Sequence, residues 1–201
     1  MVDGRAAAEG GSRRPPLARN PLVWIALIAL APIVASYVVY YLFPRAPSAN
    51  YGTLLPTAPI EGIEGTRADG SRFRLDELRG RWVLVALSGS NCDPSCERRL
   101  YATRQARTMQ GKEQDRIVRV VLLVEGKEGK VQEPSAGLLA QHPGLVVARV
   151  PESAAAKFPA GTHSLYAVDP LGNLVLSWPA DPDIKGIAND LTRLLKASRI
   201  G

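Results

Sequence analysis

Residues 82–96 read WVLVALSGSNCDPSC, and this stretch joins the predicted fold of the chain to its predicted chemistry. Its first six letters form a continuous apolar run, which is typical of a strand buried on both faces of a sheet. Its end holds the only two cysteines, Cys92 and Cys96, where we expect a helix that runs to about Met109. The stretch therefore predicts two thiols at the junction between a buried strand and a helix.

The segments on either side of this stretch alternate between apolar runs and helical or turn-rich segments. Asp69-Gly70 and Asp169-Pro170-Leu171-Gly172-Asn173 mark turns, and the second joins the strands of a predicted hairpin. In chain order, the predicted elements are a short strand within 71–78, the strand 82–87, the helix from about 92 to 109, the strand 117–124, a short helix near 135–141, the strand 145–150, a helical turn over 152–158, hairpin strands at 165–168 and 174–178, and an amphipathic helix over 181–198. This order predicts an α/β domain, with a mixed sheet and helices on both faces.

An uncharged hydrophobic segment, residues 21–43, precedes the soluble part. As a helix it would be about 34 Å long, enough to cross a hydrocarbon core of about 30 Å. A soluble domain rarely buries so long an apolar helix, and the apolar region of a cleaved signal peptide is usually only about 7–15 residues long. The run also ends in Tyr-Tyr-Leu-Phe-Pro rather than at small residues. We therefore predict one transmembrane helix that acts as an uncleaved signal-anchor.

Basic residues lie mainly on the N-terminal side of this segment. Arg13, Arg14 and Arg19 precede it, whereas only Arg45 follows it closely. Because positive charge favours the cytoplasmic side, we expect the anchor in a bacterial inner membrane, with the N-terminus in the cytoplasm and the C-terminal domain in the periplasm. The predicted segments are a disordered cytoplasmic tail (1–20), the transmembrane helix (21–43), a proline-rich linker (44–59) and one domain (60–201).

The chain has 201 residues and a net charge of +6. The basic residues of the predicted domain are scattered along it, without long runs and without interleaved aromatic residues. This pattern argues against a nucleic-acid partner. The mild excess of positive charge is typical of a solvated face, or of a patch for an acidic partner.

The spacing of Cys92 and Cys96 would place them on one face of a helix, about 6 Å apart, within reach of a disulfide or of one shared metal ion. A helix N-terminus favours a thiolate, although Asp93 slightly opposes this effect. Three roles fit: a structural disulfide, a redox-active dithiol, and a Cu(I) site completed by a neutral histidine. A disulfide that closes so small a loop would remove little chain entropy. Structural zinc is disfavoured, because the chain has only two cysteines and two histidines.

With these features the chain resembles the thioredoxin-like superfamily, and within it the SCO/SenC family of membrane-anchored copper chaperones for cytochrome c oxidase. The resemblance covers roughly residues 60–198. The residues that carry it are Asp69-Gly70, WVLV at 82–85, CDPSC at 92–96 and YAVDPLG at 166–172. It implies a thioredoxin-like fold behind a single anchor, with Cys92 and Cys96 as copper-binding thiols.

The family also has a distal histidine ligand just before the hairpin, and His163 is the matching residue here. His163 stands six residues before Asp169, whereas the copper ligand usually stands about eight before that position. Six before is where the related TlpA/ResA-type oxidoreductases, which use Cys-x-x-Cys, keep a cis-proline. A shift of two keeps a side chain on the same face of a strand, so either alignment directs His163 toward the cysteines. The alternative is a loop histidine bonded to a carbonyl group; His142, before Pro143 in a polar loop, is expected to be exposed.

The resemblance implies an assembly factor for a respiratory cytochrome oxidase. It would bind Cu(I) through Cys92, Cys96 and His163 and pass it to an oxidase subunit or to another copper or thiol protein. Two alternatives stay open from the residues themselves. One is a periplasmic thiol-disulfide oxidoreductase, in which Cys92 attacks a substrate disulfide and Cys96 resolves the intermediate. The other is a non-catalytic interaction module with a structural disulfide, so the sequence does not decide whether the chain is an enzyme.

Overall fold

The computed structural model describes residues 21–42, 50–126, 130–159, 161 and 163–198. The chain divides into two compact units, and the second begins at Asn50. The predicted tail, residues 1–20, and the last residue of the predicted anchor, Phe43, lie outside the described residues.

Helix α1, Pro21–Leu42, is the described part of the first unit. Its stretch from Pro21 to Val39 is long and apolar enough to cross a membrane, and none of it is buried inside the structure. Pro32 lies within the helix, a position that membrane-spanning helices tolerate. The prediction of one apolar helix that can anchor the chain is therefore confirmed by length and composition.

The second unit is built on a mixed sheet that, within the described residues, has the strand order β1-β8-β7-β4-β5-β6-β2-β3. The strands are β1 (Thr53–Pro59), β2 (Glu64–Arg67), β3 (Arg72–Arg74), β4 (Trp82–Ser88), β5 (Ile117–Val124), β6 (Leu145–Val150), β7 (Leu165–Val168) and β8 (Asn173–Trp178). Strands β4, β5 and β6 are parallel neighbours, and the remaining pairs are antiparallel. Strand β4, the opening of the stretch 82–96, is central and buried along its whole length, as its unbroken apolar run predicted.

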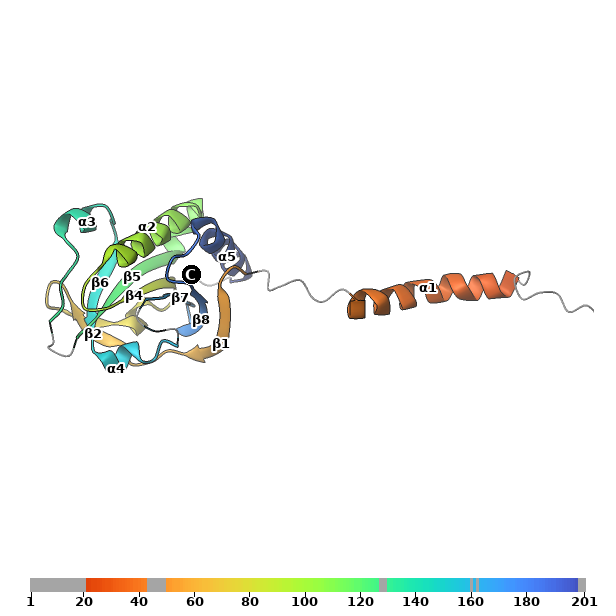
Figure 1. The fold of residues 1–201 in the computed structure, drawn as a ribbon, viewed down its shortest axis with the longest axis horizontal. Coiled ribbons are helices and arrows are strands. Elements are labelled where there is room, and N and C mark those ends of the chain that lie inside the picture. Colours follow the sequence, from red (N-terminus) through yellow and green to blue (C-terminus); the bar gives the residue numbers. More distant parts are fainter. Residues whose placement is uncertain (1–20, 43–49, 127–129, 160, 162, 199–201) are drawn as a thin grey trace, which may run out of the picture. The chain divides into compact units, whose positions relative to one another are not determined.

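Helices cover both faces of this sheet (Figure 1). They are α2 (Pro94–Thr108), α3 (Ala136–Ala140), α4 (Glu152–Ala155) and α5 (Ile184–Ala197), with short 3-10 helices η2 (Leu75–Leu78) and η3 (Gly111–Arg116). One core lies between the sheet and α2 with α5, and the other between the sheet and η2 with α4. The predicted mixed sheet with flanking helices is therefore confirmed.

Strand β1 differs from the prediction, because it lies inside the segment 44–59 that was predicted as a linker. It is an edge strand, it pairs antiparallel with β8, and its side chains are mostly exposed. Pro56 and Pro59 suit such a strand, since proline has no N–H to donate and an edge strand has a partner on one side only. The same prolines suggested a stalk when the sequence alone was considered.

A buried carboxylate fixes the start of this second unit. Asp190 of α5 is 1% exposed and accepts hydrogen bonds from the backbone N–H groups of Tyr51 (2.9 Å) and Gly52 (2.8 Å) and from the indole N–H of Trp178 (2.9 Å). The Tyr51 ring lies against Gly186 so closely that a Cβ there would stand 2.4 Å from it. The chain is thus tied to α5 and to the hairpin before β1 begins.

Candidate functional site

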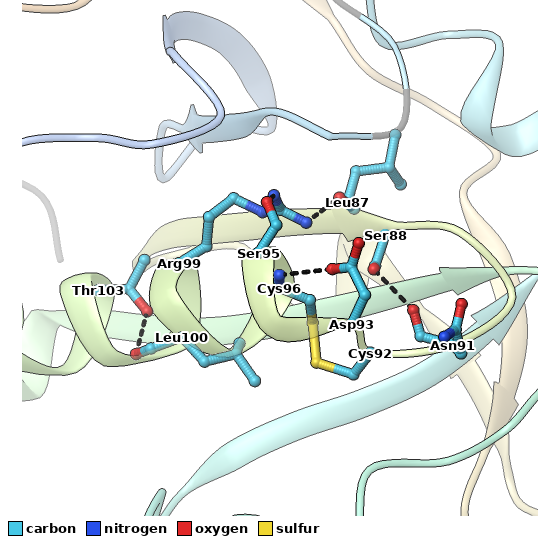
Figure 2. The surroundings of a disulfide bond; sticks show 10 residues. All are labelled: Leu87, Ser88, Asn91, Cys92, Asp93, Ser95, Cys96, Arg99, Leu100 and Thr103. Atoms are coloured by element: carbon cyan, nitrogen blue, oxygen red, sulfur yellow. Dashed lines mark hydrogen bonds between the residues drawn. A yellow bond between two sulfur atoms is a disulfide. The ribbon is translucent and has the colours of Figure 1, made fainter.

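Cys92 and Cys96 form a disulfide at the junction between β4 and α2 (Figure 2). Their Cα atoms are 5.1 Å apart. The two residues differ in exposure, because Cys96 is 0% exposed whereas Cys92 is only partly buried. The pair is therefore more exposed on the Cys92 side than on the Cys96 side.

Helix α2 begins at Pro94, and Asp93 is its N-cap. The Asp93 carboxylate accepts a hydrogen bond from the N–H of Cys96 at 2.8 Å. Aspartate is a preferred cap, and proline suits the first helical position because it has no N–H to leave unpaired. Cys92 therefore precedes the helix. The prediction that both cysteines lie on one face of a helix is therefore wrong, although their two sulfurs are bonded.

The Asp93 carboxylate brings negative charge next to the disulfide. Its pKa lies below the usual value because the Cys96 N–H binds the charged form, and because Arg99 and His163 add favourable electrostatic interactions. Asp93 is thus ionised at neutral pH, and any further negative charge on the cysteines would develop beside it.

The loop that carries Cys92 is tied to two neighbouring segments. The Ser88 hydroxyl donates a hydrogen bond to the Asn91 carbonyl at 3.0 Å. The Gln132 N–H donates to the Ser90 carbonyl at 2.7 Å, and Asn91 forms an isolated parallel bridge with Gln132. These bonds hold the loop before α2 against the segment that follows β5.

A buried arginine lies within the first two turns of α2. Arg99 is 0% exposed, and its guanidinium donates to the Ser95 hydroxyl (2.7 Å) and to the Leu87 carbonyl (3.4 Å). Its Nε atom has no hydrogen-bond partner among the described residues. Burial lowers the pKa of Arg99, and the charge of Asp93 opposes that shift. The sequence analysis did not identify this arginine, and its spacing of three from Cys96 was the available signal that it lies on the inner face of the helix.

His163 is exposed and lies in the turn before β7. Its charge acts on Asp93, and the next residue, Ser164, accepts a hydrogen bond from the Leu87 N–H at 3.2 Å. The turn therefore lies against the end of β4, close to the cysteine loop. Within the described residues no three His, Cys, Asp or Glu side chains form a group that could hold a metal ion, so His163 as a ligand stays a prediction.

His142 is buried, so the expectation that it is exposed is wrong. It is 4% exposed, and its Nδ1 lies 3.4 Å from Nη1 of Arg119, which is also buried and which donates to the Pro143 carbonyl. Burial and the positive charges of Arg119 and Arg104 lower the pKa of His142. This environment does not suit a metal ligand, because Nδ1 of His142 faces the Arg119 guanidinium.

Comparisons with known proteins support the fold. The model of the family described as transmembrane-like, thioredoxin-like, C-terminal domain matches residues 82–198. Sco1 from Thermus thermophilus, solved in its apo form, is 22% identical with a TM-score of 0.58, over 73% of this chain and 97% of that chain. ScoI from Arabidopsis thaliana with copper bound is 18% identical with a TM-score of 0.57, over 69% of this chain and 99% of that chain.

A third solved structure, a putative protein disulfide isomerase from Bacteroides thetaiotaomicron, is 13% identical with a TM-score of 0.51, over 73% of this chain and 94% of that chain. The sequence matches no curated protein. At such identities the likeness shows the fold, and the thioredoxin-like architecture that the family resemblance implied is confirmed.

Proposed function

Because the chain belongs to the family described as transmembrane-like, thioredoxin-like, C-terminal domain, we propose that it is a membrane-anchored copper-binding assembly factor for a respiratory cytochrome oxidase. The observation that carries the proposal is the cysteine pair at the end of β4. Cys92 and Cys96 form a disulfide there, in which Cys96 is buried and Cys92 is partly exposed.

In its reduced form this pair supplies two soft sulfur donors, the ligands that Cu(I) prefers. Copper is the cargo, and His163 is the proposed third ligand, since its turn lies against the end of β4 beside the cysteine loop. Transfer would proceed by ligand exchange. A thiolate of the partner first replaces the sulfur of Cys92, the more exposed of the two cysteines, and then the Cys96 sulfur, and copper stays Cu(I) throughout.

The proposed location follows from charge and from helix α1. Arg13, Arg14 and Arg19 precede the candidate span, so the N-terminus is proposed to be cytoplasmic and the cysteine domain periplasmic in a bacterial inner membrane. An oxidising compartment would also allow the Cys92–Cys96 disulfide to form when no copper is bound.

Copper titration of the reduced full-length chain in detergent tests the proposal. Under anaerobic conditions, with Cu(I) supplied from a chromogenic chelator, we expect one Cu(I) per chain and none for the Cys92→Ser/Cys96→Ser variant. His163→Ala should bind about tenfold more weakly or worse, with His142→Ala as the matched histidine control. Equal uptake by the wild type and the double cysteine variant would end the copper proposal.

The oxidase role has a separate test in cells. A strain that carries only the Cys92→Ser/Cys96→Ser chain should assemble less copper-loaded oxidase than a strain with the wild-type chain. Normal oxidase assembly in that strain would favour the non-catalytic module with a structural disulfide.

A thiol-disulfide oxidoreductase is the second candidate, and the unequal exposure of the two cysteines favours it. The Cys92 thiolate would attack a substrate disulfide and form a mixed disulfide, and Cys96 would then displace the substrate thiol and close the disulfide seen here. In a Cys96→Ser variant the mixed disulfide should accumulate with periplasmic partners. If none is trapped, while copper uptake by the wild type is intact, this candidate fails.

A further inference from the structure

Arg99 is costly for the fold. It is a cation of α2 that is 0% exposed, its Nε has no partner among the described residues, and its bond to the Leu87 carbonyl is long at 3.4 Å. Burying a charge with few hydrogen bonds costs free energy, and an apolar residue of similar volume is often as stable or more stable in such a place. The other buried residues of α2 are mostly small or apolar: Cys96, Leu100, Ala102, Thr103 and Ala106. Stability alone therefore does not explain an arginine here.

The position of Arg99 connects it to the cysteine pair. It follows Cys96 by three residues on the helix, and it binds the hydroxyl of Ser95, which lies between the two cysteines. Arg99 also interacts electrostatically with Asp93, whose carboxylate binds the Cys96 N–H. In the view of Figure 2 the Asp93 carboxylate lies between the guanidinium and the disulfide. Among the charges near the pair, the Asp93 anion and the Arg99 cation act on each other, and the exposed residues Glu97 and Arg98 lie in the same turn of α2.

Charge balance shows what the cation would do. The disulfide carries no charge, so Asp93 and Arg99 compensate each other in the oxidised site. A pair of thiolates with one Cu(I) carries one net negative charge, and a reduced pair with one thiolate carries the same. Each would develop next to the Asp93 carboxylate, and without Arg99 the reduced or copper-loaded site would gather negative charges at a partly buried position with no buried cation beside them.

We propose that Arg99 is the positioning and charge-compensating residue of this site, which stabilises the reduced and copper-loaded states relative to the disulfide. The inference rests on the proposed function of the cysteine pair. Its redox half can be measured without copper and without an oxidase, so it can hold or fail separately from that function.

The experiment is a glutathione equilibrium with the full-length chain in detergent at pH 7.5. Reduction breaks the Cys92–Cys96 S–S bond and transfers two electrons and two protons from two glutathione thiols, which leave as glutathione disulfide; a cysteine that then ionises releases its proton to solvent. For Arg99→Met we expect a shift toward the disulfide of about tenfold or more, which is about 30 mV for a two-electron couple. Cu(I) affinity, measured by chelator competition, should fall by about tenfold as well.

Three further variants make the result specific. Arg99→Lys keeps the charge and should recover most of the shift. Asp93→Asn keeps a good helix cap but removes the anion, and should move the equilibrium toward the dithiol. Arg119→Met removes another buried arginine, 3% exposed, whose guanidinium contacts His142 and the Pro143 carbonyl and no residue of the segment 92–96, and should change the equilibrium by less than about twofold.

The outcomes decide the proposal in either direction. If Arg99→Met stays folded and keeps the wild-type equilibrium and copper affinity within about threefold, the proposal is overturned. If Arg119→Met shifts the equilibrium as much as Arg99→Met, the effect belongs to buried arginines in general and the proposal is overturned too. If Arg99→Met does not fold, the other two variants still test the proposal. Asp93→Asn should shift the equilibrium toward the dithiol, and Arg99→Lys should stay close to the wild type. No shift in Asp93→Asn would count against the proposal. Redox shifts without any copper uptake would leave Arg99 in its role and remove the copper function.

Discussion

Helices α2 and α5 begin in the same way. In each, an aspartate caps the helix and its carboxylate accepts the N–H three residues further on, from Cys96 to Asp93 at 2.8 Å and from Gly186 to Asp183 at 2.7 Å. Each helix also buries one charged side chain. The two helices differ in how completely the protein satisfies that charge.

In α5 the buried charge is Asp190, which accepts three hydrogen bonds of 2.8–2.9 Å and lies 3.8 Å from Arg193. In α2 it is Arg99, which has one short bond, one long bond and an unpaired Nε among the described residues. A satisfied buried ion joins separate parts of a fold, whereas a poorly satisfied one is a cost that a functional site can explain. We therefore interpret Asp190 as structural and Arg99 as part of the site.

The largest expected effect is the loss of Asp190. Asp190→Ala should lower the free energy of unfolding by about 3–5 kcal/mol, because the two backbone N–H groups and the Trp178 indole N–H would stay buried without an acceptor. Chemical denaturation of the full-length chain measures this. Asp183→Ala removes only the exposed cap of the same helix and should cost about 1 kcal/mol, so equal losses for the two variants would break the comparison.

The next effect concerns the contact between Gly186 and Tyr51. Gly186→Ala should cost about 2 kcal/mol, because the new Cβ would stand 2.4 Å from the Tyr51 ring. Helix propensity alone predicts the opposite sign, a gain of about 1 kcal/mol. The double variant Tyr51→Ala/Gly186→Ala should therefore lose less than the sum of the two single losses in denaturation. A stabilised Gly186→Ala variant would show that this contact does not hold the segment before β1.

A smaller effect concerns pH, at the buried histidine beside Arg119. Because the pKa of His142 in the folded protein lies below its usual value, the unfolded chain binds a proton more readily than the folded one. The contribution of His142 to stability is complete above the unfolded pKa of about 6.5 and is lost as the pH falls toward the folded pKa. Denaturation midpoints at pH 7.5 and 5.5 should therefore differ less in His142→Gln than in the wild type. If His142→Gln kept the full wild-type difference between the two midpoints, the buried histidine would not be its source.

The smallest expected effect on stability is that of Arg99→Met. Its free energy of unfolding should stay within about 1 kcal/mol of the wild type, or rise, because an apolar side chain suits the place as well as an underbonded cation does. The same denaturation series measures it. A loss of about 3 kcal/mol or more would mean that Arg99 holds the fold as Asp190 does, and the contrast between the two helices would disappear.

Sequence patterns predicted the central elements well. Strand β4 contains a continuous apolar run, β5 and β6 are apolar runs with one arginine each, and the turn Asp169–Asn173 with its flanking runs predicted the hairpin of β7 and β8. Such patterns report burial on both faces of a sheet or a local turn, and both are properties of a short segment. The meeting of Cys92 with Cys96 also follows from local spacing.

The features that the sequence did not predict depend on contacts between distant segments. Arg99 and His142 are polar, and their burial results from packing against the end of β4 and against Arg119. The acceptor role of Asp190 is visible only when Tyr51, at the other end of the domain, lies against it. The start of α2 is a different case, since Asp93-Pro94 is a local cap signal that would have placed the helix start correctly.

The edges of the sheet affect how readily two copies of the chain could pair when both are held at a membrane by helix α1. Anchored chains are confined to two dimensions, where collisions between copies are frequent and an open strand edge invites intermolecular pairing and aggregation. On one edge, β1 carries Pro56 and Pro59, which offer no N–H to an incoming strand. On the other edge, β3 is only three residues long, and its exposed Arg72 and Arg74 are held in ion pairs with Glu64 and Asp76, so little open strand is left for a second copy. Both ends of the sheet therefore discourage the self-association that crowding would otherwise promote.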